Sequence, residues 1–268
     1  MNLILIEAHE LVPSLAAPGA PRYVVTFTDT LRVKHLAQVL RVEVGARLRV
    51  GVIDGALGEG EVAHIGVAAF TLLVTLADAP APARIDVLLA VPRPKALGRL
   101  YSPLAQLGIG RLVLSGAERV ERYYFDAHQV DVGFARAQFL EGLAQARDTR
   151  VPQVEIHRRL DHALASALGA ASGPPSSPGA AHRAGAALAA PSRAFYADPG
   201  DAPAPRVAVQ GLGPTERVLV VIGPEGGFRD RERAFLARAG LTPIALGPRV
   251  LRTDVAAIAL LALLHDAL

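Results

Sequence analysis

Cysteine is absent from the 268 residues of this sequence. A chain without thiols forms no disulfide, no thiolate zinc site and no cysteine-held iron–sulfur cluster, and it offers no cysteine nucleophile. The eight histidines are scattered and show no His-Glu-x-x-His spacing, so no metal site is expected. Long apolar runs are missing too, since no stretch approaches the ~20 uninterrupted apolar residues that cross a bilayer. The sequence therefore predicts a protein with no metal and no membrane partner.

A basic leader is also missing from the start of the chain. The short apolar run at residues 2–6 meets Glu7 and Glu10 almost at once, which is not the pattern of a signal peptide. With 51% hydrophobic and 20% charged residues, the composition is that of a globular protein with ample material for a core. We therefore expect a soluble, cytoplasmic protein.

Lysine is scarce, because only Lys34 and Lys95 stand among the 28 lysines and arginines. Arginine has a planar guanidinium fork that suits phosphate groups. The formal net charge is only +3, and the excess lies in residues 81–160, which carry 12 basic and 8 acidic side chains. A weak excess of this kind is ordinarily a solvated surface, so charge alone does not establish nucleic-acid binding.

The first 80 residues have the pattern of short strands with one helix. Asp54-Gly55 is a turn signal between two strands, and the Pro/Ala-rich segment 78–84 is typical of a short stiff linker. Alternating and β-branched residues predict strands at 22–28, 46–52, 60–65 and 70–76 and a helix at 30–41. We expect a small β-barrel-like module that ends near residue 77.

The remainder of the chain alternates strands with helices. The expected elements are strands at 85–91 and 111–115, helices at 95–107 and 131–146, and a largely irregular excursion rich in Gly, Ala, Pro and Ser at 169–206. Such alternation is typical of βαβ units with a parallel sheet. The fold class predicted for this part is therefore α/β.

The last 51 residues contain two similar units in tandem. A strand at 218–222 precedes the loop 223–228 and a charged helix that runs to residue 239; a strand at 242–246 precedes the loop 247–252 and an apolar helix. Ligands of parallel sheets bind outside the carboxyl ends of the strands, where both Gly-Pro loops belong. Neither loop has a Walker motif or a Gly-x-Gly-x-x-Gly pattern. Ordinary tight βα turns are the alternative interpretation.

Several motifs resemble those of the RsmE methyltransferases, a family of the SPOUT class. IGPEGGF at 222–228 and LGPRVLRTDVAAIALLALL at 246–264 are similar to that family's cofactor-binding end, and HLAQVLRVEVGARLRVGVIDGALGEGEV at 35–62 is similar to its N-terminal PUA-like domain. LAQARDTRVPQVEI at 143–156 resembles a segment of the middle of the family's chain. RVERYYF at 119–125 and FYADP at 195–199 resemble stretches of one branch. The motifs occur in the family's order.

The resemblance implies a PUA-like, RNA-binding β-barrel domain at 1–77, a linker at 78–84 and a SPOUT methyltransferase domain at 85–268. It also implies a trefoil knot at about 218–268 and a homodimer packed through the knot. The activity implied is methylation of N3 of a uridine in 16S ribosomal RNA of the small ribosomal subunit, with S-adenosyl-L-methionine (SAM) as methyl donor. The residues implied for SAM are Ile222, Gly223, Pro224, Glu225, Gly226, Gly227, Leu246, Gly247, Val250 and Leu251. A third cofactor loop would lie before residue 218.

The cysteine-free chain restricts the chemistry to direct attack by a nitrogen or an oxygen, because thiolate and radical routes both need cysteine. Uracil N3 is a poor nucleophile until it loses its proton, so its site needs a base or a cation. The catalytic candidates are Arg252 and Arg249 as cations and Glu225 as a carboxylate. Asp254 is a further carboxylate, but it would equally suit the first turn of a helix.

Nine basic residues are the candidates for RNA contact: Arg22, Lys34, His35, Arg41, Lys95, Arg99, Arg119, Arg122 and Arg147. Each could instead be a solvated charge or part of a local ion pair. The sequence also departs from the family pattern, since residues 1–21 contain no arginine and Asp254-Val255-Ala256 stands where Glu-Thr-Ala is common. A paralogue that binds RNA and cofactor without catalysis, or that acts on another RNA, therefore stays open as an alternative.

Overall fold

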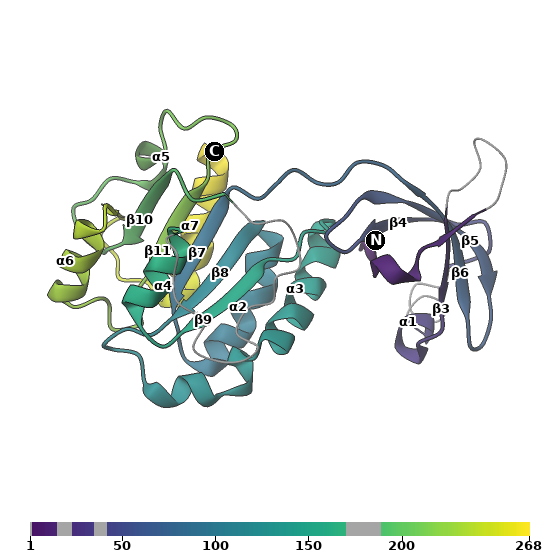
Figure 1. The fold of residues 1–268 in the computed structure, drawn as a ribbon, viewed down its shortest axis with the longest axis horizontal. Coiled ribbons are helices and arrows are strands. Elements are labelled where there is room, and N and C mark those ends of the chain that lie inside the picture. The colour runs from purple at the N-terminus through teal and green to yellow at the C-terminus, as the bar shows by residue number, and fades with distance from the viewer. Residues whose placement is uncertain (1, 15–22, 35–41, 170–188) are drawn as a thin grey trace. The chain divides into compact units, whose positions relative to one another are not determined.

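The computed structural model describes residues 2–14, 23–34, 42–169 and 189–268. The chain forms two compact units, one made of residues 1–81 with 143–150 and the other of residues 82–142 with 151–268. Figure 1 shows the elements of both.

The first unit is built on a curled six-stranded sheet. Its strand order is β1-β4-β5-β6-β3-β2, in which only the β1–β4 pair is parallel. The elements are β1 (Ile4–Ile6), η1 (Ala8–Glu10), β2 (Val12–Pro13), β3 (Tyr23–Phe27), α1 (Thr30–Lys34), β4 (Arg47–Val52), β5 (Leu57–Ile65) and β6 (Phe70–Leu76). Leu48 and Val50 of β4 are buried while Arg47 and Arg49 are exposed, as the alternation predicts. The part of the predicted helix 30–41 beyond Lys34 lies outside the described residues.

Residues 143–150 belong to the first unit, which the sequence did not predict. The backbone explains this assignment. Leu3 donates its N–H to the carbonyl of Ala144 at 2.8 Å, and Asp54 donates to the carbonyl of Thr149 at 2.7 Å. The buried Thr149 hydroxyl also donates to the Gly55 carbonyl at 2.6 Å, so the predicted Asp54-Gly55 turn is fixed by a residue far along the chain.

The second unit contains a six-stranded sheet with all strands parallel. Its order is β12-β10-β11-β7-β8-β9. The strands are β7 (Ile85–Ala90), β8 (Ile109–Ser115), β9 (Gln153–His157), β10 (Arg193–Ala197), β11 (Val218–Ile222) and β12 (Thr242–Ile244). All residues of β7, β8 and β11 are buried. The sequence of β11 is apolar throughout, whereas β7 and β8 carry a buried ion pair between Asp86 and Arg111 at 3.2 Å.

Helices cover both faces of this sheet (Figure 1). They are α2 (Pro94–Gln106), α3 (Val132–Ala146), α4 (Leu160–Ala167), α5 (Pro205–Ala208), α6 (Asp230–Arg238) and α7 (Thr253–Ala267), with short turns η3 (Arg122–Asp126) and η4 (His128–Val130). Leu164 of α4 and Leu236 of α6 share one core cluster with Leu88, Leu219 and Val221 of the strands. Alternate strand residues face the other side, where α7 packs against β11 and beside α2.

One strand of this unit was not predicted from the sequence. Within residues 169–206, expected to be mostly an irregular excursion, residues 170–188 lie outside the described part, and the remainder contains β10, which pairs with β11 on one side and β12 on the other. Phe195 and Tyr196 of β10 are buried. The small residues and prolines around β10 do not predict a strand. Its pairing with two neighbouring strands determines its conformation. The carboxyl ends of β10, β11 and β12 therefore stand side by side.

The described residues contain no helix that is long and apolar enough to cross a membrane. The cytoplasmic location and the trefoil knot at 218–268 remain predictions from the sequence and the resemblance.

Candidate functional site

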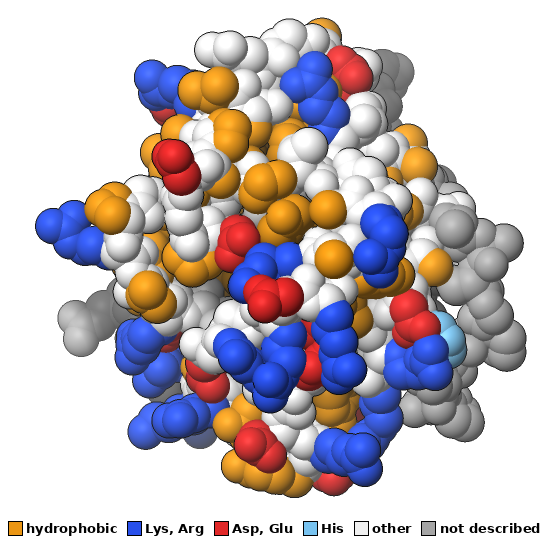
Figure 2. Space-filling view, turned by 90° about the vertical axis from the view of Figure 1, so that its left-hand side faces the viewer, with side chains coloured by type: hydrophobic (Ala, Val, Ile, Leu, Met, Phe, Trp, Pro, Cys, Tyr) orange, Lys and Arg blue, Asp and Glu red, His pale blue; other side chains and the backbone are white. Residues whose placement is uncertain are grey.

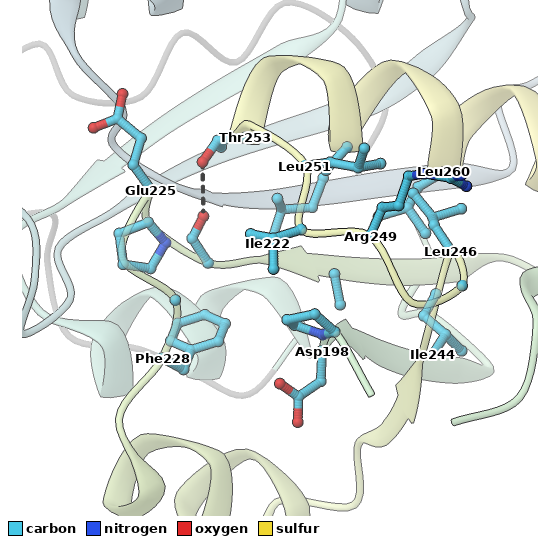
Figure 3. Close-up of a pocket in the computed structure, with 18 residues that line it drawn as sticks. Asp198, Ile222, Glu225, Phe228, Ile244, Leu246, Arg249, Leu251, Thr253 and Leu260 are labelled. Atoms are coloured by element: carbon cyan, nitrogen blue, oxygen red, sulfur yellow. Dashed lines mark hydrogen bonds between the residues drawn. The ribbon is translucent and has the colours of Figure 1, made fainter. Parts of the chain in front are cut away.

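An apolar cleft lies at the carboxyl ends of β10, β11 and β12 and at the start of α7 (Figure 3). Its volume is about 100 Å³. Three loops and one helix end supply its lining: Ala197, Asp198, Pro199, Ile222, Gly223, Pro224, Glu225, Gly227, Phe228, Ile244, Leu246, Gly247, Arg249, Val250, Leu251, Thr253, Ala256 and Leu260. Open parallel sheets bind their ligands at this edge, so the cleft is the expected place for a site.

Two glycines give the cleft loops their backbone shape. Gly227 has φ +71° and Gly247 has φ +92°, a region that side-chain-bearing residues rarely adopt. A Cβ atom added at either position would meet no atom within 4 Å, so the cleft wall is open in front of both. The Thr253 hydroxyl donates a long hydrogen bond of 3.4 Å to the Gly223 carbonyl (Figure 3). This contact connects the first loop to α7.

Nine of the ten residues proposed for SAM line this one cleft, although they come from two separate loops. The exception is Gly226, whose carbonyl accepts a hydrogen bond from Arg119. A Cβ at Gly226 would lie 3.0 Å from Arg119 Cδ, so this arginine covers the outer side of the loop.

The third loop of the cleft is the segment 197–199 after β10. Asp198 is the cleft carboxylate that the sequence prediction missed, and it lies 3.8 Å from Arg233 of α6. The quoted motif FYADP at 195–199 was the available signal, but only the pairing of β10 with β11 and β12 brings it to the cleft.

A second cavity of about 230 Å³ adjoins the cleft. Glu225 and Thr253 line both, so they form a shared wall. The lining of this cavity is charged: Arg93, Lys95, Ala96, Arg99, Glu225, Arg252, Thr253 and Asp254. Four cations against two carboxylates leave an excess of positive charge. The sequence predicted four of these residues as site residues, Lys95, Arg99, Glu225 and Arg252, but not Arg93.

Asp254 organises one side of this second cavity. Its Oδ2 lies 3.2 Å from Arg252 Nη2 and 3.7 Å from Arg99 Nη2, so one carboxylate holds arginines from α7's start and from α2. Its Oδ1 accepts the N–H of Val255 at 3.0 Å in the first turn of α7. Both interpretations of Asp254 are therefore compatible: it serves the helix start and it orients two cations.

Glu225 is held on the opposite side by Arg93. Arg93 Nε lies 3.5 Å from Glu225 Oε2, and the Arg93 N–H points to Oε1 at 3.4 Å. Figure 3 shows Glu225 at the margin of the cleft, on the side of Thr253. Arg249, the other cation candidate, lines the cleft and is absent from the lining of the second cavity. The two arginines that the sequence grouped together thus belong to different cavities.

The other RNA candidates are distributed over both units. Arg119 lines a shallow hollow with Arg229, Arg231 and Arg233 of the α6 region, and Arg122 is exposed on η3. Figure 2 shows lysine and arginine side chains gathered on the face of the second unit that carries α6. Lys34 and Arg147 are exposed in the first unit, and Arg147 has φ +61°. Arg22, His35 and Arg41 lie outside the described residues.

Two family models cover most of this chain. A model described as an RNA methyltransferase domain matches residues 79–265, and one described as an RNA methyltransferase PUA domain matches residues 28–67. The chain belongs to the RNA methyltransferase family. The first match contains both cavities, and the second falls within the first unit, where it includes β4 and β5. The expectation of an α/β methyltransferase of the RsmE type with a PUA domain is confirmed.

This RNA methyltransferase has curated relatives of similar length. It is 27% identical over 97% of its residues to the ribosomal RNA small subunit methyltransferase E of Treponema pallidum, covering 88% of that protein. Among solved structures, the ribosomal RNA small subunit methyltransferase E of Neisseria gonorrhoeae, bound to S-adenosyl methionine, has a TM-score of 0.68 at 17% identity, covering 98% of this chain and 97% of that one. A Legionella pneumophila protein in complex with the bound cofactor SAM gives 0.69 at 19%, covering 100% and 98%. This RNA methyltransferase shares their fold.

Groups of His, Cys, Asp and Glu that could hold a metal ion are not found in the described part of this RNA methyltransferase.

Proposed function

We propose that this RNA methyltransferase transfers a methyl group from SAM to N3 of a uridine in the 16S RNA of the small ribosomal subunit. The observation that carries the proposal is the wall of Glu225 and Thr253 shared by an apolar cleft and a cationic cavity. A methyl transfer needs two sites that meet at the reacting atoms, one for the donor and one for the acceptor. The curated relative from Treponema pallidum, by its name, acts on small-subunit ribosomal RNA, which supports the choice of substrate.

The cleft fits SAM by the chemistry of its lining. Ile222, Leu246 and Leu251 offer apolar surface for the adenine ring, and the open backbone at Gly247 lets that ring approach closely. Asp198 and Glu225 are carboxylates at the cleft that suit the hydroxyl and cationic groups of SAM. When bound, SAM supplies a methyl group on a positively charged sulfur.

The second cavity supports the role of acceptor site. Its charged lining suits a polar, flat group such as a pyrimidine base. A base must leave its stack to enter such a cavity. Arg252, aided by Asp254, would stabilise the negative charge that uracil gains as N3 loses its proton, and Glu225 would accept that proton. Nitrogen N3 would then form the new bond to the methyl carbon as the bond between that carbon and the SAM sulfur breaks, with the electron pair staying on the sulfur of the S-adenosylhomocysteine that leaves.

The two domains and the homodimer also belong to this proposal. The PUA-like domain at 1–77 would hold RNA, and the domain at 85–268 would carry out the transfer. Apolar residues on α7 support self-association, because Val255, Ile258 and Leu263 are each more than 40% exposed and Val250 in the second loop is 80% exposed. The homodimer through the region 218–268 would cover them. Mass measurement in solution of Ile258→Asp against the wild type tests this, and an unchanged mass contradicts it.

The test of the activity is a turnover assay with methyl-labelled SAM on small subunits from a strain that lacks the enzyme. Nucleoside mapping by mass spectrometry then identifies the modified base. We expect the wild-type enzyme to produce one N3-methyluridine in the 16S RNA of these subunits. Binding of SAM and RNA without transfer would indicate a non-catalytic paralogue, and a methyl group on another RNA or atom would contradict the proposed target.

A further inference from the structure

Tyr123 is the exposed aromatic residue of this protein. All phenylalanines and tyrosines lie in the described parts of the chain. Among them only Tyr123 is exposed, with 63% of its surface accessible to solvent. It lies on η3, between β8 and α3. An exposed aromatic ring does not gain the free energy of burial within its own chain. It is therefore available to bury its surface against a partner.

The position of Tyr123 connects it to the acceptor cavity. Its ring meets that of Tyr124 edge to face, with 4.9 Å between centroids. Tyr124 is buried, and burial first, followed by the neighbouring Tyr123 hydroxyl, raises its pKa, whereas the nearby Arg93 lowers it. Arg93 and Glu225 in turn line the cavity. Tyr124 therefore lies near both the exposed ring and an arginine of the cavity wall.

Exposed arginines surround Tyr123, interspersed with the exposed carboxylates Glu121 and Asp126, the second of which pairs with Arg158 at 2.9 Å. Arg122 precedes it and is exposed, and Arg93 has 75% of its side chain exposed. The neighbouring Phe125 ring is covered by Arg158, whose guanidinium carbon lies 5.2 Å from the ring centroid. An aromatic ring among exposed arginines is typical of single-stranded nucleic-acid binding, where bases stack on rings and cations contact phosphates. A purely apolar protein partner would need apolar neighbours instead.

We propose that Tyr123 stacks on the base of the nucleotide next to the target uridine, with Arg122 contacting the adjoining phosphate. The inference rests on the proposed function only in taking the second cavity as the acceptor site. A uridine drawn out of its stack into the cavity loses its neighbour on one side, and that neighbour exposes a face. Tyr123 covers this face, so the ring both holds the strand and favours the unstacked conformation.

The test uses short single-stranded RNAs that contain one uridine flanked on either side, in separate probes, by the fluorescent base 2-aminopurine. Matched probes carry an abasic site at the same position. Four variants are compared with the wild type: Tyr123→Ala, Tyr123→Leu, Tyr123→Phe and, as a control, Val207→Ala, which shortens an exposed apolar side chain on α5 of the same unit. Circular dichroism and mass in solution check that each variant keeps its fold and assembly state.

We expect the wild type to quench 2-aminopurine on one side of the uridine only. Stacking of one base is worth ~1–3 kcal/mol, so Tyr123→Ala should weaken binding about 5- to 150-fold. Tyr123→Leu should behave like the alanine variant, whereas Tyr123→Phe and Val207→Ala should bind like the wild type. The abasic probe should remove the difference between wild type and Tyr123→Ala.

Three results would overturn the inference. The first is that Tyr123→Ala binds RNA as tightly as the wild type, and the second is that RNA binds without quenching on either side of the uridine. The third is a changed solution mass of Tyr123→Ala, which would assign the ring to a contact between two copies of the chain. The proposed function fails separately. Quenching and a Tyr123 effect on the probes, combined with no methyl transfer to small subunits from the strain that lacks the enzyme, would contradict N3 methylation and leave the stacking intact. A wild type that binds neither the probes nor small subunits contradicts both.

Discussion

Arg252→Ala removes one of the four cations that line the acceptor cavity and not the cofactor cleft. Arg252 lines the cavity and is absent from the lining of the cleft. Its side chain is 73% exposed, and Asp254 pairs with it at 3.2 Å. Asp254 keeps a second cation, Arg99, at 3.7 Å when Arg252 is gone, so the substitution leaves no carboxylate unpaired.

The expected magnitudes separate catalysis from stability. Removing one preorganised donor to a developing anion typically lowers kcat by about 10²–10³. An exposed ion pair contributes only about 0–1 kcal/mol to folding, so the free energy of unfolding should hardly change. The Kd for SAM should stay within about twofold of the wild type, because the Arg252 side chain does not line the cleft in which SAM is proposed to bind. Arg252→Lys should restore little, since an ammonium group does not reproduce the planar fork.

The assay is single-turnover methyl transfer, with the Kd for SAM measured by calorimetry and the solution mass determined on the same preparation. Arg249→Ala is the matched control, because this arginine precedes Arg252 on the same loop but lines the cleft. It should raise the Kd for SAM more than it lowers the single-turnover rate at saturating SAM.

The reasoning would be refuted if Arg252→Ala lost SAM affinity, mass and rate in parallel. That outcome would mean that Arg252 only holds the loop through Asp254. Equal rates for Arg252→Ala and the wild type at saturating substrates would also refute it.

Three further predictions concern the cleft, the RNA and the pH. Gly247→Val places a β-branched residue at φ +92° in the cleft wall, whereas Gly240→Val creates the same strain at φ +88° outside it; calorimetry should show weaker SAM binding for the first only, and equal losses would remove this loop from the site. Affinity for RNA should fall with salt by roughly 0.7–0.9 log units per phosphate contact and log unit of salt, while SAM affinity stays nearly constant; a flat profile for RNA in a filter-binding titration would contradict phosphate contacts. Burial raises the pKa of Glu155, but hydrogen bonds from His157 and Ser166 and a nearby arginine bring it below its usual 4.5, so its contribution to stability is present above that value and is lost as pH falls through the folded pKa. Urea unfolding between about pH 6 and about pH 3 should therefore show a smaller loss for Glu155→Gln than for the wild type, and parallel curves would contradict the assignment.

Local pattern in the sequence determined most elements of this protein. The apolar run 218–222 and the alternation at 46–52 predicted strands, and β11 and β4 are where those patterns indicated. The cofactor candidates came from the family resemblance, and nine of the ten line one cleft. Strand patterns depend on neighbours within a few positions along the chain, because burial on one face and backbone conformation are local requirements.

The tertiary structure alone decided how these parts combine into a site. Segment 197–199 joins the cleft only because β10 lies between β12 and β11, and no local pattern records which strands become neighbours. No local pattern predicts that Arg249 and Arg252, three positions apart, line two different cavities. Nor does a local pattern predict the ion pair between Arg93 and Glu225. Charge positions on loops follow from sheet register and helix packing, which are long-range properties of the folded chain.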